Sequence, residues 1–269
     1  MTVRRLSQKR NWAWNIAVPT LKPPLIAVVS REWIDGVKIP ATGGCLVVFN
    51  HISHADPLLA AHFVYDHGRL PRYLAKSGLF KNRALGGFLK AAGQIPVERL
   101  TQNAVGAYDA AVAAVRAGEC VVVYPEGTLT RDPGLWPMTG KSGAARIALE
   151  TGCPVIPVGQ WGAQDLLAPY AVVPHPFPRK KVVMKAGDPV DLADLIDQPR
   201  TPEVVQAATD RIMAALTALV AEIRGEEPPA ERFDPRKAGV RPIGNPRKAA
   251  RRAARENARS TLPGKKDGA

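Results

Sequence analysis

The chain has 269 residues, of which 46% are hydrophobic, and a formal net charge of +13 at pH 7. This length fits one main domain with appendages, and the hydrophobic content is sufficient for a buried core. An odd number of cysteines and no signal-peptide pattern argue against a disulfide-stapled secreted protein and predict a reducing, cytosolic environment. Cys45, Cys120 and Cys153 each begin an apolar run and are predicted to be core residues rather than nucleophiles.

Residues 1–35 combine basic and aromatic residues with an interrupted apolar stretch. Trp12 and Trp14 follow a basic cluster, and Lys22 and several prolines break up the apolar residues that come next. The stretch therefore falls short of the roughly 20 apolar residues that a spanning helix needs. Tryptophan beside basic residues is typical of a membrane interface. We predict peripheral or monotopic attachment to the cytoplasmic face of the cell membrane; a helical cap packed on the core is the alternative interpretation.

The most informative segment is Asn-His-Ile-Ser-His-Ala-Asp at residues 50–56, directly after the strand-like run 45–49. A histidine with a carboxylate five positions on can form a general base and its orienting partner, here His51 and Asp56. Asp56 precedes a proline and an apolar run, so it is also a predicted helix N-cap. His51, His54 and Asp56 could alternatively ligate a metal, although no second cluster has ligand spacing.

A second loop with polar residues follows another predicted buried strand. Residues 72–76 and 94–97 are strand candidates, residues 104–117 form a predicted amphipathic helix, and the apolar run within 118–124 leads into Pro-Glu-Gly-Thr. Two buried strands that each end in a polar loop predict neighbouring strands, with both loops at the carboxyl-end crevice. Gly127 would allow close backbone approach, and amides beside Thr128 could hold an anion; an ordinary turn is the alternative.

The rest of the domain is predicted to be scaffold. Lys141 lies in a sequence that approximates a phosphate-binding P-loop, but the glycine spacing and the preceding strand are missing, so nucleotide hydrolysis is rejected. Residues 154–158 and 181–185 are further strand candidates, and Thr201 is predicted to cap a long helix that ends near Arg224. The predicted fold class is α/β, with a mixed, largely parallel sheet flanked by helices and a short N-terminal helical segment that faces the membrane.

The C-terminal residues are strongly basic. From residue 236 to residue 266 there are 11 basic residues against the single acidic residue Glu256, and Pro, Gly and Ala fill the gaps. This composition predicts a disordered tail. Anionic lipid and nucleic acid are the competing partners, and a merely solvated tail is the third interpretation. Without interleaved aromatic residues or a recognised module, the pattern favours an anionic membrane surface and no nucleic acid.

Four short motifs, in order, resemble those of the glycerolipid acyltransferases, the PlsC-like 1-acyl-sn-glycerol-3-phosphate acyltransferase family. They are the His-x4-Asp motif at 51–56, Gly-Gln-Ile-Pro-Val-Glu-Arg at 93–99, Tyr-Pro-Glu-Gly-Thr at 124–128 and Val-Ile-Pro-Val at 155–158. The resemblance spans roughly residues 36–190. It implies an acyltransferase domain at 36–225, between the N-terminal segment 1–35 and the basic tail 226–269. Leu129 stands where the family often has arginine, and Arg131 follows two positions later.

The resemblance also implies an activity in phospholipid biosynthesis. An acyl group would move from acyl-CoA or acyl-carrier protein to the sn-2 hydroxyl of 1-acyl-glycerol 3-phosphate (lysophosphatidic acid), giving phosphatidic acid without a cofactor or metal. His51 would take the hydroxyl proton, Asp56 would orient the imidazole, and Arg99 would bind the acceptor phosphate. Further candidate substrate contacts are Lys76, Glu126, Gly127, Thr128 and Lys141.

Two alternatives remain open at the level of the sequence. The acceptor could be glycerol 3-phosphate or another lysophospholipid, because Leu129 departs from the family pattern. The chain could also be a non-catalytic membrane-binding module that keeps the fold. The presence of His51, Asp56, Glu126 and Arg99 argues against that second alternative.

Overall fold

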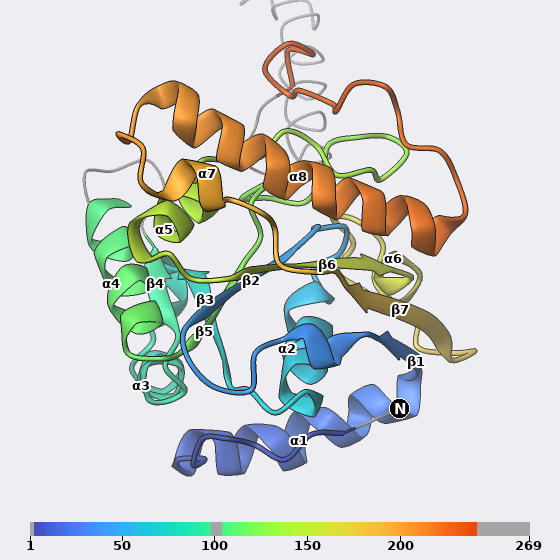
Figure 1. Ribbon diagram of the computed structural model, residues 1–269. Helices are drawn as coiled ribbons and strands as arrows, with labels where there is room; N and C mark the ends of the chain where they lie inside the picture. Colours follow the sequence, from blue (N-terminus) through green and yellow to red (C-terminus); the bar gives the residue numbers. More distant parts are fainter. Residues whose placement is uncertain (1–2, 98–103, 241–269) are drawn as a thin grey trace, which may run out of the picture.

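A computed structural model describes residues 3–97 and 104–240, which form a seven-stranded sheet with helices on both faces (Figure 1). The order across the sheet is β1-β7-β6-β2-β5-β3-β4, and all neighbouring strands are parallel except β6 and β7. The strands are β1 (Val29–Ile34), β2 (Cys45–Phe49), β3 (Pro71–Lys76), β4 (Ile95–Val97), β5 (Cys120–Val123), β6 (Val155–Trp161) and β7 (Lys180–Ala186). The predicted mixed, largely parallel sheet is confirmed.

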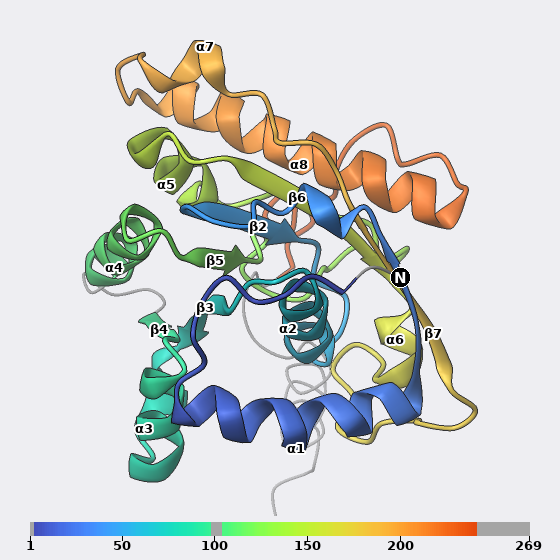
Figure 2. The same ribbon diagram turned by 60° about the horizontal axis from the view of Figure 1, so that its bottom comes forward.

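The helices form one layer on each face of the sheet, with α1 and α2 on one side and α4, α5 and α8 on the other (Figure 2). The α-helices are α1 (Trp12–Val28), α2 (Asp56–Asp66), α3 (Arg83–Ala91), α4 (Ala104–Arg116), α5 (Gly143–Thr151), α6 (Ala163–Leu166), α7 (Ala193–Ile196) and α8 (Pro202–Arg224). Two 3-10 helices, η1 (Gly36–Lys38) and η2 (Ser77–Phe80), lie in connections. The sheet is therefore covered on both faces, as parallel sheets generally are.

The central strand β2 shows how its sequence builds two hydrophobic cores. Successive side chains of a strand point to opposite faces of the sheet. Leu46 and Val48 accordingly belong to the core beneath α4, α5 and α8. Cys45, Val47 and Phe49 belong to the core beneath α2. All five side chains are buried, so the strand is a continuous apolar run rather than an alternating one.

The N-terminal residues form a helix and an edge strand. The Asn11 side chain caps α1 by accepting hydrogen bonds from the amides of Ala13 (3.1 Å) and Trp14 (3.2 Å). Helix α1 lies on the same side of the sheet as α2 (Figure 2). Lys22 Nζ of α1 lies 2.6 Å from Asp66 Oδ1 of α2. Residues 29–34, within the predicted N-terminal segment, form β1 and pair with β7.

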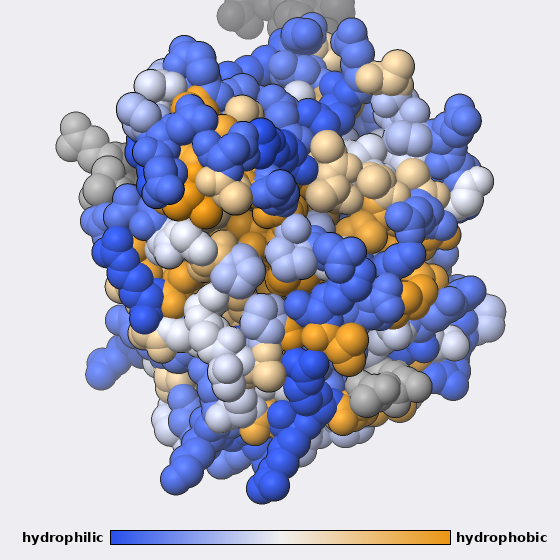
Figure 3. Space-filling view, in the orientation of Figure 1, coloured by the Kyte–Doolittle hydropathy of each residue, from blue (hydrophilic) through white to orange (hydrophobic). Residues whose placement is uncertain are grey.

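The long C-terminal helix α8 is amphipathic and packs on the sheet. The Thr201 side chain accepts a hydrogen bond from the Val204 amide at its start, and Gly225 ends it in the left-handed conformation. Among the described residues, α8 alone is long and apolar enough to cross a membrane, but most of its apolar stretch is buried against the protein. The face in Figure 3 is largely hydrophilic, with hydrophobic residues in separate patches. We therefore treat α8 as a core helix.

Candidate active site

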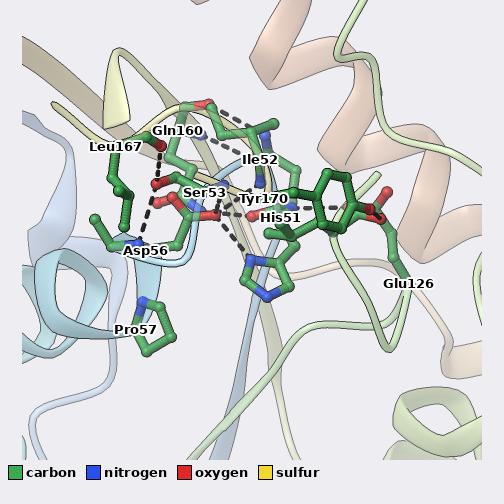
Figure 4. Close-up of polar contacts among 12 residues, drawn as sticks. His51, Ile52, Ser53, Asp56, Pro57, Glu126, Gln160, Leu167 and Tyr170 are labelled. Atoms are coloured by element: carbon green, nitrogen blue, oxygen red, sulfur yellow. Dashed lines mark hydrogen bonds and ion pairs between the residues drawn. The ribbon is translucent and has the colours of Figure 1, made fainter. Parts of the chain in front are cut away.

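His51 and Asp56 meet in the loop between β2 and α2. His51 Nδ1 lies 2.8 Å from Asp56 Oδ2, and the same oxygen accepts hydrogen bonds from the amides of Ile52 (2.7 Å) and Ser53 (2.8 Å) (Figure 4). Asp56 is fully buried, whereas the His51 side chain is 14% exposed. The predicted N-cap role of Asp56 is wrong, because α2 begins at Asp56 and the cap position is Ala55. The carboxylate turns back to hold the loop instead.

The backbone of this loop is fixed to neighbouring strands and loops. The Gln160 amide of β6 donates to Asn50 Oδ1 (2.8 Å), and Asn50 Nδ2 donates back to the Gln160 carbonyl (3.1 Å). The Thr130 amide, in the loop after β5, donates to the His51 carbonyl (2.7 Å). These bonds join the carboxyl ends of β2, β5 and β6. The position of His51 therefore depends on three neighbouring strands of the sheet.

Glu126 joins the second loop to the first. Its Oε1 accepts a hydrogen bond from the His51 amide (2.8 Å), and its Oε2 accepts one from the Met138 amide (3.1 Å). Burial raises the pKa of Glu126 to about 8, although the two amide hydrogen bonds act in the opposite direction. Both oxygens are thus occupied by protein amides. Glu126, predicted to contact the substrate, is placed by this geometry to position His51.

Aromatic rings support the His51 imidazole. The Tyr124 ring stacks on it, with centroids 4.3 Å apart and an interplanar angle of 29°. Tyr73 lies parallel to Tyr124, and its hydroxyl donates to the Pro57 carbonyl (2.8 Å). Sequence reasoning assigned no role to either tyrosine. The available signal for Tyr124 was its position directly before the Pro-Glu-Gly-Thr segment, whereas Tyr73 lies on a different strand and gave none.

Gly127, Thr128 and Lys141 lie together beside this loop. Gly127 has φ +69°, and a Cβ added there would lie 2.7 Å from Lys141 Nζ, so the lysine side chain passes directly over the glycine backbone. The Lys141 amide donates to the Pro125 carbonyl (2.8 Å), and Thr128 is half-buried. Lys76 is the last residue of β3, paired with Val97, and its side chain is not described. Arg99 lies outside the described residues, so its predicted phosphate contact stays a prediction.

Tyr170 reaches the site from the connection between α6 and β7. Its ring centroid lies 6.1 Å from that of His54 and 5.0 Å from the Arg131 guanidinium. Burial lowers the pKa of His54, and the nearby His51 lowers it further, while Asp56 raises it. Leu129 is only 2% exposed, and its carbonyl accepts a hydrogen bond from the Tyr170 hydroxyl (3.3 Å). Tyr170 gave no signal in the sequence because it is 41 positions away from Leu129, which it contacts.

The fold and this site define an α/β protein with a histidine–carboxylate pair at the carboxyl ends of parallel strands. Hydrogen bonding to Asp56 leaves Nε2 as the ring nitrogen that can exchange a proton with a ligand, and Figure 4 shows it turned away from Asp56. A family model described as acyltransferase matches residues 34–161, which include His51, Asp56 and Glu126. The matched residues are just under half of the chain, and over them the chain is similar to this acyltransferase family.

Individual relatives resemble the chain over part of their length. The chloroplastic 1-acyl-sn-glycerol-3-phosphate acyltransferase BAT2 of Brassica napus is 29% identical over 124 residues, which cover 46% of this chain and 34% of that protein. A 1-acyl-sn-glycerol-3-phosphate acyltransferase of Borreliella burgdorferi is 31% identical over 135 residues, which cover 47% and 52%. The chain therefore spans about a third of the first relative's length and about half of the second's.

A solved structure shares the fold. The crystal structure of the 1-acyl-sn-glycerophosphate acyltransferase PlsC from Thermotoga maritima aligns with a TM-score of 0.54 at 22% sequence identity. The alignment covers 78% of this chain and 81% of that one. At this level of identity the match supports the architecture, a mixed sheet between helical layers.

Proposed function

We propose that the chain is an O-acyltransferase that moves a fatty acyl group from a thioester to the sn-2 hydroxyl of 1-acyl-glycerol 3-phosphate, giving phosphatidic acid. The observation that carries the proposal is the 2.8 Å contact between His51 Nδ1 and Asp56 Oδ2. The similarity to the acyltransferase family over residues 34–161 and the names of the relatives suggest the reaction and the substrate class.

The mechanism follows from the geometry of the pair. His51 Nε2 takes the proton of the acceptor hydroxyl as its oxygen attacks the thioester carbonyl, and Asp56 stabilises the imidazolium that forms. The carbon–sulfur bond then breaks, the ester carbonyl reforms, and the imidazolium proton neutralises the departing thiolate. No acyl-enzyme is needed, which agrees with the cysteines: Cys45 and Cys120 are buried within strands. Lys141 beside Gly127 supplies positive charge for the anionic groups of the substrates.

A shallow apolar groove lies between α1 and α2. Its cavity volume is about 50 Å³, and its lining includes Leu58, in the first turn of the helix that begins at Asp56. Its lining is almost entirely apolar: Trp14, Ala17, Val18, Leu21, Lys22, Leu25, Leu58, Ala61, His62 and Tyr65. Sites for apolar ligands are concave and mostly apolar with few polar groups. The groove supports a lipid substrate whose chain lies beside α1.

The exposed side of α1 supports attachment to a membrane. Trp12, Ile16 and Leu21 are exposed there, and Lys9 and Arg10 precede the helix. An apolar, tryptophan-bearing helix next to basic residues suits the interface of an anionic bilayer. We infer peripheral or monotopic association with the cytoplasmic face, where acyl-CoA or acyl-carrier protein is available as the donor. Glycerol 3-phosphate or another lysophospholipid remains the alternative acceptor, since Leu129 is buried where the family often has arginine.

The first experiment incubates the purified chain with lysophosphatidic acid in vesicles and a long-chain acyl-CoA, and follows free thiol and phosphatidic acid together. We expect equal release of thiol and product, and a loss of about 10²- to 10⁴-fold in kcat for His51→Ala and for Asp56→Asn. Asp165→Asn, an exposed aspartate on α6, is the matched control and should retain full activity.

Each other result of this assay points to a different alternative function. Thiol release without lipid product would indicate a thioesterase or a different acceptor, which parallel reactions with glycerol 3-phosphate and lysophosphatidylcholine distinguish. Absence of turnover with acyl-CoA and with acyl-carrier protein would favour the non-catalytic membrane-binding module. Full activity of His51→Ala would remove the pair from the mechanism.

A further inference from the structure

The connection between α6 and β7 carries the most exposed large hydrophobic residues of the described chain. In the 171–178 loop, Val172 is 89% exposed, Val173 69% and Phe177 74%. The loop consists of Ala, Val, Pro, His and Phe residues and contains no Asp, Glu, Lys or Arg. It is followed directly by three basic residues, Arg179, Lys180 and Lys181. Single exposed hydrophobic residues are common, but such a cluster marks an interaction site.

Several hydrogen bonds hold this loop in place. The Ala171 amide donates to the Ala168 carbonyl (2.9 Å), and the His175 amide donates to the Leu166 carbonyl (2.7 Å). At the end of the loop, Arg179 Nη2 donates to the carbonyls of Ile26 and Val29, each at 2.9 Å. The apolar side chains are thus presented by an ordered backbone, so a partner does not have to order the segment on binding.

The 171–178 loop lies at the C-terminal end of α1. The bonds from Arg179 join it to the last turn of α1 and the first residue of β1, and Figure 2 shows the connection between α6 and β7 next to that end of the helix. The exposed side chains of Trp12 and Ile16 lie farther along α1. The loop and α1 therefore lie side by side, and each exposes apolar side chains to solvent.

The base of the loop reaches the candidate active site. The Ser53 hydroxyl, in the loop that holds His51 and Asp56, donates to the Leu167 carbonyl (2.7 Å). Tyr170, just before the loop, has its ring 6.1 Å from that of His54. If the tip of the loop binds a surface, that surface lies close to the loop of His51 and Asp56, where the acceptor hydroxyl must bind.

We propose that the 171–178 loop inserts into the interface of an anionic lipid bilayer, as a second attachment point beside α1, and brings the lipid acceptor to His51. The partner is identified by chemistry: an apolar tip followed by three basic residues, of which Lys181 is paired with Glu32 (2.8 Å), complements acyl chains beneath anionic headgroups. That the acceptor is a lipid rests on the proposed function, whereas the insertion itself is measured without turnover.

The test compares two sites of equal chemistry. Val173→Cys and Val37→Cys each receive an environment-sensitive fluorophore; Val37 is also exposed but lies beyond the opposite end of β1. Cys45 and Cys120 are buried, and background labelling is measured on the unsubstituted chain. Vesicles of equal parts phosphatidylglycerol and phosphatidylcholine should raise the emission of the label at residue 173 severalfold and leave that at residue 37 unchanged. Equal responses, or none at residue 173, would overturn the proposal.

A second measurement links insertion to binding. The variant Val172→Ser/Val173→Ser/Phe177→Ser should bind these vesicles at least tenfold more weakly than the unsubstituted chain, whereas Val37→Ser should bind equally well. Wild-type affinity of the triple variant would refute insertion, and so would specific capture of the loop by a soluble protein instead of lipid. If the loop inserts but no acyl transfer is detected, the proposed function fails while this inference stands.

Discussion

At the scale of single residues, the raised pKa of Glu126 predicts how the stability of the protein depends on pH. Its pKa is raised from 4.5 to about 8 by burial, so the folded protein holds a proton that the unfolded chain releases. The contribution of this group to stability is fully present below pH 4.5 and is lost as the pH rises towards 8. The free energy of unfolding should fall through this range by about 1.4 kcal/mol per pH unit from Glu126.

Glu126→Gln tests this dependence because its amide does not titrate. The variant should be less stable at low pH, since only one of its two side-chain polar atoms can accept a hydrogen bond from the His51 or Met138 amide. The difference in the free energy of unfolding between the wild type and Glu126→Gln should become smaller as the pH rises. Urea unfolding at several pH values measures both curves, with Glu150→Gln, an exposed residue, as the control. Parallel curves for the wild type and Glu126→Gln would show that Glu126 is ionised in the folded state.

The catalytic pair could be predicted from the sequence because its two residues are close together in the chain. His51 and Asp56 are five positions apart in one loop, so spacing alone indicated a base and its partner. Tyr170 and Thr130 contact this loop from distant segments, and no pattern in the sequence specifies those contacts. Glu126 was found, but its orientation was not, because only the fold shows which amides point at its oxygens.

At the scale of elements, burial explains which strands were predictable. The central strands β2 and β5 are buried throughout, and the sequence shows them as unbroken apolar runs. The edge strand β1 instead includes Ser30, Arg31 and Glu32, and its side chains range from buried to exposed. No apolar run marks it, so sequence reasoning placed these residues in the N-terminal segment. Its pairing with β7 joins residues that are 151 positions apart in the sequence.

The contact between β6 and α8 yields a prediction about stability. A Cβ added to Gly159 would lie 2.8 Å from Leu219 Cβ and 3.0 Å from the Leu219 carbonyl carbon, so α8 would have to shift. We expect Gly159→Ala to lower the free energy of unfolding by about 1–3 kcal/mol, the usual cost of overpacking. Gly143→Ala at the start of α5 is the control, because nothing lies within 4 Å of the added carbon. Calorimetric melting of both variants decides the matter, and equal melting temperatures would contradict the tight packing.

At the scale of the whole molecule, residues up to 240 pack on the domain. Arg232 Nη2 lies 2.5 Å from Asp210 Oδ1 of α8, and the Thr139 amide donates to the Phe233 carbonyl (3.0 Å). The segment through Phe233 thereby supports the loop that contains Lys141. The predicted boundary after residue 225 is therefore a poor place to truncate the chain, whereas a truncation after Val240 preserves these contacts.

Truncation after Val240 tests the role of residues 241–269, the part of the predicted basic tail that lies outside the described residues. Residues 241–269 contain nine Lys or Arg and two Asp or Glu, so removing them lowers the formal net charge from +13 by 7 to +6. Each basic residue near an anionic bilayer contributes roughly 1 kcal/mol, so engagement of only three corresponds to about 100-fold in affinity. Sedimentation with phosphatidylglycerol vesicles at low salt should show a loss of that order.

Salt and lipid composition separate the tail from the apolar attachment points. Electrostatic adsorption weakens with added salt, whereas insertion of α1 and the 171–178 loop depends on apolar area, so the truncated chain should keep a weaker, less salt-sensitive affinity. On neutral phosphatidylcholine vesicles the full and truncated chains should bind equally. An unchanged affinity for anionic vesicles would make the tail a solvated extension and would assign membrane attachment to α1 and the 171–178 loop, whose exposed apolar side chains lie near basic residues.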